Sequence, residues 1–198
     1  QEYFNSKIDN RKKEYEQGTE EGIKDLISLV ISSSKYPAYF PQEYTLEYNA
    51  ETHMLVVEYI LPVPENLPNL KDVKYIQTKN EFKETYLSEG STSKLYDDLL
   101  YKMTLRTIRE ILDADIKKHI HAIVFNGWVN STDKATGKEY SACILSIQTE
   151  RDEFMDINLS QVDPKVCFKK LKGIGSSKLF SLTPVAPILK INRNDSRF

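Results

Sequence analysis

The strongest candidate for a catalytic constellation is an aspartate followed by an acid-x-Lys pair. Asp72 precedes Glu81-Phe82-Lys83. A divalent-metal nuclease uses such groups, because carboxylates hold the metal while a lysine helps to position or activate the attacking water. The same spacing recurs at Asp72/Lys74, Asp115/Lys117 and Asp163/Lys165. Because composition alone accounts for such pairs in a chain rich in acids and lysines, we predict no catalytic residue here.

Two further patterns lack the partners that their chemistry needs. His119 and His121 have a spacing used by metal ligands, but the only other histidine, His53, is remote in sequence, so we predict no metal site. The run from Lys172 to Lys178 superficially resembles a phosphate-binding loop, yet it lacks the required spacing and follows a helix. Its glycines instead fit a helix that ends with a C-cap at Gly173, followed by a turn. Backbone N–H groups flanked by lysines there remain candidates for contact with a DNA phosphate.

The two cysteines are best explained as buried residues. Cys143 lies in the apolar run Ala142-Cys143-Ile144-Leu145, and Cys167 is also in apolar surroundings. Free cysteine commonly packs as a small hydrophobe. Two cysteines make no disulfide framework, so we expect a reducing, cytoplasmic setting.

Positive charge is concentrated toward the C-terminal end. The net charge is −2, which argues against a strong overall field for nucleic acid. From position 164 onward there is one acid, Asp195, against eight basic residues: Lys165, Lys169, Lys170, Lys172, Lys178, Lys190, Arg193 and Arg197. A solvated helix face with a basic linker explains this asymmetry, and so does contact with an anionic partner. For DNA phosphates, the predicted contacts are Lys169, Lys170, Lys172 and Lys178.

The elements that position these residues follow from hydrophobic periodicity and turn chemistry. Helices are predicted at 1–17, 19–31, 91–118 and 163–173, and hairpins at 44–48/54–61, 73–78/82–87 and 120–129/141–149. Thr19 and Asp163 are predicted helix N-caps. The apolar, Pro-interrupted stretch 179–191 is predicted to lie extended on the sheet.

Hairpins, rather than strand–helix–strand alternation, predict an α+β fold. We expect a mainly antiparallel sheet packed by one long helix, with residues 1–35 as a helical arm and 36–198 as the α+β domain. No run approaches the ~20 apolar residues of a membrane span, so we expect no membrane partner. Because the chain starts at Gln1 and runs to Phe198 without an obvious stop, we expect an excerpt of a longer protein.

Several blocks together resemble the region that precedes the nuclease domain in bacterial Mrr-like restriction endonuclease proteins. They are Leu55-Val56-Val57-Glu58-Tyr59 with Leu61-Pro62, Val124-Phe125-Asn126-Gly127, Cys143-Ile144-Leu145-Ser146, the stretch 162–171, the stretch 182–189, and Asp195-Ser196-Arg197-Phe198. The resemblance covers about 36–198 and includes no catalytic motif. It implies a cytosolic, DNA-cleaving defence protein whose Mg-dependent nuclease domain follows Phe198 in the same chain.

The first hypothesis is therefore a non-catalytic recognition or regulatory domain of such a nuclease, without a cofactor of its own. A second is a structural or oligomerisation module that pairs protomers through the N-terminal helices and the long helix, as a homo-oligomer. A third is a free-standing metal nuclease using Asp72, Glu81 and Lys83.

Overall fold

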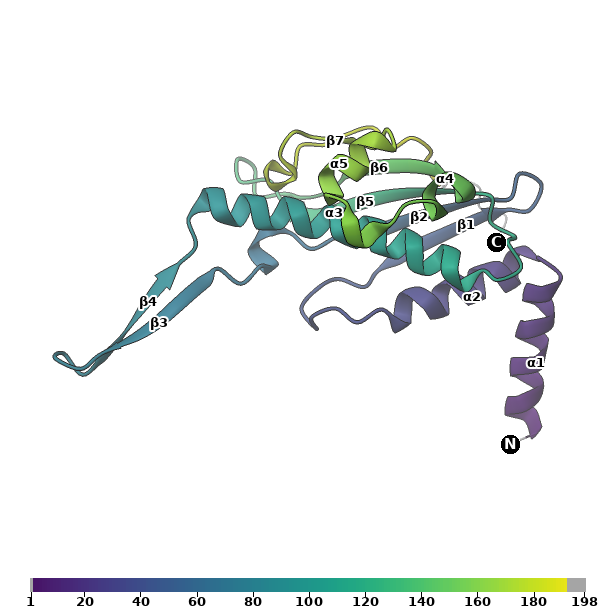
Figure 1. Cartoon of the computed structure of the whole chain (residues 1–198), viewed down its shortest axis with the longest axis horizontal. Coiled ribbons are helices and arrows are strands. Elements are labelled where there is room, and N and C mark those ends of the chain that lie inside the picture. Colours follow the sequence, from purple (N-terminus) through teal and green to yellow (C-terminus); the bar gives the residue numbers. More distant parts are fainter. Residues whose placement is uncertain (1, 192–198) are drawn as a thin grey trace.

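The protein folds as a mixed sheet with helices on one face and a hairpin that projects from one end (Figure 1). A computed structural model describes residues 2–191, with side chains from residue 8 onward. The elements are α1 (Glu2–Glu16), α2 (Glu20–Ser33), β1 (Tyr44–Asn49), β2 (Met54–Ile60), η1 (Pro64–Asn66), β3 (Leu70–Ile76), β4 (Glu81–Tyr86), α3 (Glu89–Ala114), β5 (Ala122–Thr132), β6 (Glu139–Glu150), α4 (Arg151–Met155), η2 (Leu159–Gln161), α5 (Pro164–Lys170), β7 (Ile174–Gly175) and η3 (Leu179–Ser181). The predicted α+β class is confirmed.

The main sheet has the strand order β1-β2-β5-β6-β7, and one of its pairings is parallel. Val56 of β2 lies opposite Val124 of β5 in that parallel pair, whereas the other neighbours are antiparallel. A parallel pair needs a crossover connection, which α3 supplies. The prediction of hairpins alone missed this unit, because the β3–β4 hairpin is inserted between β2 and α3 and hides the strand–helix–strand order.

The crossover helix α3 begins at Glu89, directly after its N-cap residue Ser88. The Ser88 hydroxyl accepts a hydrogen bond from Ser91 N at 3.2 Å, and Glu89 stands in the first turn, where a negative charge suits the helix dipole. The apolar face, including Leu100 and Ile108, is fully buried. The helix ends at Ala114, earlier than the predicted end at 118, so Ile116 lies beyond it and is exposed.

One apolar core lies between the helices and the sheet. The strands contribute Val57 and Phe125, and α2 contributes Ile23, Ile27 and Ile31 to the same cluster. The capping of α2 is as predicted, because the Thr19 hydroxyl accepts from Gly22 N at 3.2 Å. Residues 20–33 therefore share a core with the sheet. Within residues 2–191, no helix is both long and apolar enough to cross a bilayer.

The other face of the sheet carries buried polar groups that bind the C-terminal segment. Asn126 and Ser146 lie opposite each other on β5 and β6, and Ser146 Oγ donates to Asn126 Oδ1 at 2.7 Å. Asn126 Nδ2 donates to Leu189 O at 2.6 Å, and Ile188 N donates to Ser146 Oγ at 3.0 Å. The predicted docking on the sheet is confirmed for residues 185–189. Leu179–Ser181 instead forms the short helix η3, which packs against α3 and is not extended. Arg193, Asp195 and Arg197 lie outside the described residues.

A buried ion pair closes the end of the core where α3, β5 and α4 meet. The guanidinium of Arg151 binds the Asp115 carboxylate through Nη2. Its Nε donates to Ile120 O at 2.7 Å, and its Nη1 donates to Leu112 O at 3.0 Å. The guanidinium thus caps the carbonyl end of α3 and holds the start of β5.

The carboxylate of Asp115 is equally well partnered. It accepts from Ile120 N at 2.8 Å, from His119 N at 3.2 Å and from the Tyr15 hydroxyl at 3.0 Å. A buried charge with a salt-bridge partner and several hydrogen bonds avoids the cost of lost hydration. Through Tyr15, this carboxylate also holds α1 against the body.

Asp115→Ala removes the carboxylate that pairs with Arg151 and leaves the buried guanidinium without its counter-charge. The substitution should therefore lower the free energy of unfolding by about 3–5 kcal/mol. The matched control is Asp113→Ala, which breaks an exposed ion pair with Arg109 on the same helix (2.9 Å) and should cost less than about 1 kcal/mol. Urea unfolding followed by circular dichroism measures both. Equal losses for the two variants would contradict the role given to the buried pair.

Candidate nucleic-acid interface

The basic helix α5 has its start defined by two residues. The Asp163 carboxylate accepts from Val166 N at 2.9 Å and Pro164 occupies the first turn, as predicted. Phe168 is buried and packs on Tyr101 of α3, with ring centroids 5.0 Å apart. This packing leaves Lys169 and Lys170, in the last turn, exposed to solvent.

The turn after α5 is built differently from the prediction. Lys172, not Gly173, takes the left-handed conformation (φ +60°). Gly173 N donates to Phe168 O at 2.9 Å, and a Cβ at Gly173 would lie 2.4 Å from Phe168 Cε1. The prediction that Gly173 caps the helix through a left-handed conformation is therefore wrong, because Lys172 takes that conformation. Glycine is needed because an aromatic ring packs against the backbone, and this contact fixes the position of exposed Lys172.

A carboxylate on α3 anchors the segment that carries Lys178. Asp97 Oδ2 lies 3.3 Å from Lys165 Nζ, and Asp97 Oδ1 accepts from Phe180 N at 3.2 Å. Lys165 Nζ also donates to Ser177 O at 3.1 Å. The charge of Lys165 is thus used internally, and the adjoining Lys178 is left exposed between two fixed backbone points.

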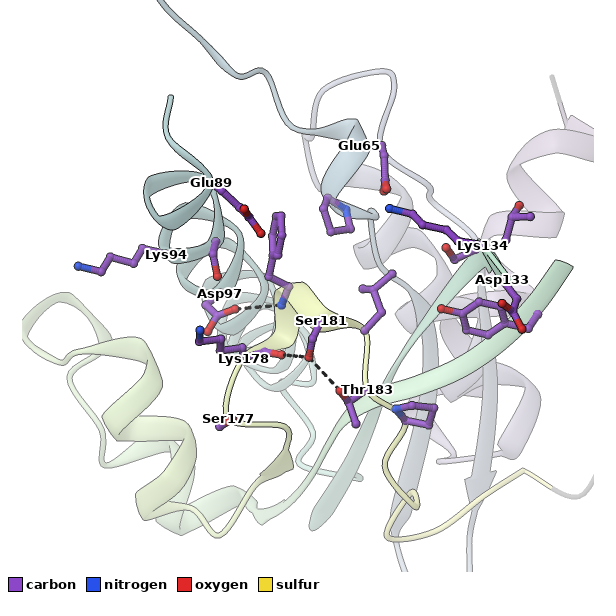
Figure 2. Close-up of a pocket in the computed structure, with 18 of the residues that line it drawn as sticks. Glu65, Glu89, Lys94, Asp97, Asp133, Lys134, Ser177, Lys178, Ser181 and Thr183 are labelled. Atoms are coloured by element: carbon purple, nitrogen blue, oxygen red, sulfur yellow. Dashed lines mark hydrogen bonds between the residues drawn. The ribbon is translucent and has the colours of Figure 1, made fainter. Parts of the chain in front are cut away.

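Lys178 lies at the edge of an open cleft of about 1470 Å³, bounded by the start of α3, η1, the β5–β6 loop and residues 177–184 (Figure 2). Charges of both signs line it: Lys94, Lys134, Lys138, Lys165 and Lys178 against Glu65, Glu89, Asp97, Asp133 and Glu139. The cleft as a whole therefore has no excess of positive charge that would attract an anion. Hydroxyl groups such as Ser181 and Thr183 line it, but none of its described lining residues is a histidine that could activate one.

The four lysines predicted to contact phosphates are all exposed and unneutralised. In the described part of the chain, none of Lys169, Lys170, Lys172 and Lys178 lies in an ion pair. Three stand on α5 and its C-terminal turn, and Lys178 follows beyond β7. Residues 164–191 contain six lysines and no acid. This acid-free stretch, which we call the lysine surface, is the most cationic described part of the molecule.

The residues that the third hypothesis assigned to a metal nuclease do not lie close together. On the β3–β4 hairpin, Asp72 lies opposite Thr85 and Glu81 lies opposite Ile76. The two carboxylates are thus four residues apart along the ribbon, roughly 13 Å at the rise of a strand. They are exposed, and Lys83 lies opposite Lys74 rather than in a cavity. This arrangement provides no metal centre.

The histidines also occupy different surroundings. Both precede β5, which begins at Ala122, and the ring of His121 lies 4.4 Å from that of His53, while His119 packs edge-on against Tyr15 (5.4 Å). Among residues 2–191, no group of three or more His, Cys, Asp or Glu is arranged to hold a metal ion. The His53–His121 contact was not predicted, because 68 residues separate the partners along the chain.

Both cysteines are buried, as predicted. Burial raises the pKa of the Cys143 thiol to about 12 and also raises that of Cys167. Because the thiolate is the nucleophile and both thiols stay protonated at neutral pH, neither residue has the chemistry of a catalytic cysteine.

Comparison with protein-family models, curated proteins and solved structures finds no match to this chain. The resemblance to the region preceding the nuclease domain of Mrr-like proteins therefore stays a prediction.

Gly173→Ala forces a methyl group into the ring of Phe168 and should lower the free energy of unfolding by about 1–3 kcal/mol. Gly90→Ala is the matched control, because nothing lies within 4 Å of a Cβ there; as a helical position it should gain up to about 1 kcal/mol. Urea unfolding of the two variants measures the difference. A neutral Gly173→Ala would show that the lysine-bearing turn is not set by this contact.

Proposed function

We propose that the chain is a non-catalytic domain that contacts the phosphate backbone of duplex DNA through Lys169, Lys170, Lys172 and Lys178. The observation that carries the proposal is the lysine surface, a stretch without acids whose exposed lysines have no ion-pair partner in the described part of the chain. Lysine ammonium groups bind phosphate oxygens as point charges, and releasing the counterions of DNA drives such binding.

The contacts that hold the backbone beneath these lysines support this function. α5 is held by Phe168 on Tyr101, and the segment around Lys178 is held by Asp97. The backbone under each cation is thus ordered before any ligand arrives, which reduces the entropy lost on binding. Among the described residues, Lys165 is the lysine of this stretch that pairs with an acid, and it helps to fix the segment.

The overall charge of −2 limits the expected affinity. Lys178 lines the cleft, whose acidic and basic residues are balanced in number, so the cleft adds little to the attraction for DNA. Phosphate contacts of this kind position a protein on the duplex without reading its sequence. We therefore expect weak, salt-sensitive binding, in the range of ~10⁻⁴ to 10⁻⁶ M at physiological salt.

In the setting that the sequence resemblance suggests, this domain belongs to a cytosolic restriction endonuclease of the Mrr-like kind. Cleavage and its Mg²⁺ would then belong to a nuclease domain elsewhere in the parent chain.

A role in oligomerisation through the long helix has less support. Most apolar side chains of α3, such as Leu100 and Ile108, are buried within this chain and are not free to meet a second copy.

The double variant Lys169→Ala/Lys170→Ala should weaken binding to labelled duplex DNA and flatten the salt dependence. Each lost phosphate contact reduces the slope of log K against log salt by about 0.9, so a change of about 2 is expected. Fluorescence anisotropy across a salt series, with unmodified and methylated duplexes, measures both quantities.

The control is Lys12→Ala/Lys13→Ala, which removes the same charge from exposed positions of α1, away from α5 (Figure 1). It should leave the slope unchanged. Equal effects of the two double variants, or no binding by the unaltered chain at low salt, would overturn the proposal.

A further inference from the structure

The β3–β4 hairpin forms an arm that stands away from the body of the protein (Figure 1). It makes a two-stranded sheet of its own, and no strand of the main sheet pairs with it. A two-stranded hairpin is marginally stable in water unless something packs on it or extends it. Both long edges of this arm carry unpaired backbone groups, which are a template for another strand.

One face of the arm is apolar and exposed. Tyr75 lies opposite Phe82, with ring centroids 5.3 Å apart. Phe82 is 72% exposed and Tyr75 is 53% exposed, with Val73 and Tyr86 beside them at similar values. Aromatic side chains of this size are characteristic of the centre of protein–protein contacts. Nothing in the described chain covers them.

The opposite face of the arm has a charge pattern that is complementary to itself. Each strand carries an acid, an apolar residue and a lysine in succession, Asp72-Val73-Lys74 on β3 and Glu81-Phe82-Lys83 on β4. When a strand pairs with an antiparallel copy of itself about its apolar residue, each acid lies opposite a lysine. Opposite charges in directly facing positions stabilise a strand pair, and like charges destabilise it.

The two edges are not equally suited to such pairing. β3 has a register irregularity between Leu70 and Asp72, and bulges of this kind protect an edge from further pairing. β4 is regular through Glu81–Tyr86. Moving the symmetry axis along β4 to Lys83 or to Glu84 would place that residue opposite its own copy, like charge against like. Phe82 is therefore the favoured centre.

We propose that two copies of this chain associate edge to edge through β4, antiparallel, about a two-fold axis at Phe82. Phe82 then faces its own copy, while Glu81 and Lys83 each face the opposite charge of the other molecule. The result is a four-stranded sheet with a continuous aromatic face, formed through an isologous contact. On this proposal, the Glu81-Phe82-Lys83 pattern that suggested a metal site instead sets the register of a dimer.

The arm is better suited to a second copy than to DNA. A two-stranded ribbon fits the major groove, but such a ribbon must be cationic to approach phosphates. Residues 70–86 contain four lysines and three acids, and the apolar face carries an acid, Glu84, which accepts a hydrogen bond from the Tyr86 hydroxyl. A contact limited to one strand edge is small, so the dimer should dissociate in the micromolar range.

Charge reversal tests the register. Glu81→Lys alone, or Lys83→Glu alone, places like charges opposite each other twice and should weaken self-association by about tenfold or more. An equimolar mixture of the two variants restores opposite charges at both positions, so a heterodimer should form as tightly as the unaltered dimer. Sedimentation velocity of the 198-residue chain over a concentration series measures all three.

A single cysteine tests the symmetry. Phe82→Cys places two thiols across an antiparallel pair, where the Cα separation of ~4.5–5.5 Å suits a disulfide. Mild oxidation should give a covalent dimer on non-reducing gels, and buried Cys143 and Cys167 do not compete. Glu84→Cys is the control, because its own copy lies several residues away and no such dimer should form.

Asp72→Lys on the other edge should leave association unchanged. A monomer at all concentrations, failure of the mixed variants to associate, or equal cross-linking from Glu84→Cys would each overturn the proposal. Loss of association on Asp72→Lys but not on Glu81→Lys would overturn the choice of β4. None of these results bears on the lysine surface, whose DNA affinity is measured separately.

Discussion

The ion pair of Asp115 with Arg151 is the constraint on which the arrangement of the helices depends. Its partners come from α1, from the end of α3, from the connection into β5 and from α4. Buried charges tolerate little displacement, because each loses far more hydration than a distant partner returns. The pair therefore fixes where α3 ends and how the chain enters the central strand β5. It does so by hydrogen bonds to backbone N–H and carbonyl groups, which apolar packing alone would not orient.

Asp97, a carboxylate within α3, fixes a segment at the surface in the same way. The helix is fixed on the sheet at its C-terminal end by Asp115 and, through Asp97, it fixes the segment around Lys178 and Phe180. Helix α5 is packed against the same helix through Phe168 and Tyr101. The exposed lysines thus derive their positions from α3, although none of them lies on it.

Local patterns predicted the elements well and long-range relations poorly. The cap at Asp163 and the turn near Asn80 are set by residues close in sequence, and both were predictable. The parallel pairing of β2 with β5 was not, because an inserted hairpin separates the partners. Asp115 gave no signal, since an acid at a helix end usually meets water. The lysine surface was visible as charge segregation. That Lys169, Lys170, Lys172 and Lys178 have no ion-pair partner among the described residues is a property of the folded chain.

The position of the arm inside the β2–α3–β5 crossover has a consequence for variation of the chain. Ile60 and Ala122 bracket a closed loop of 61 residues, and the entropy cost of closing a loop rises only logarithmically with its length. Lengthening or shortening β3 and β4 by a few residues therefore changes the closure cost by a small fraction of a kcal/mol. The sheet and its core tolerate such changes, so the reach of the arm is free to diverge while the body stays the same.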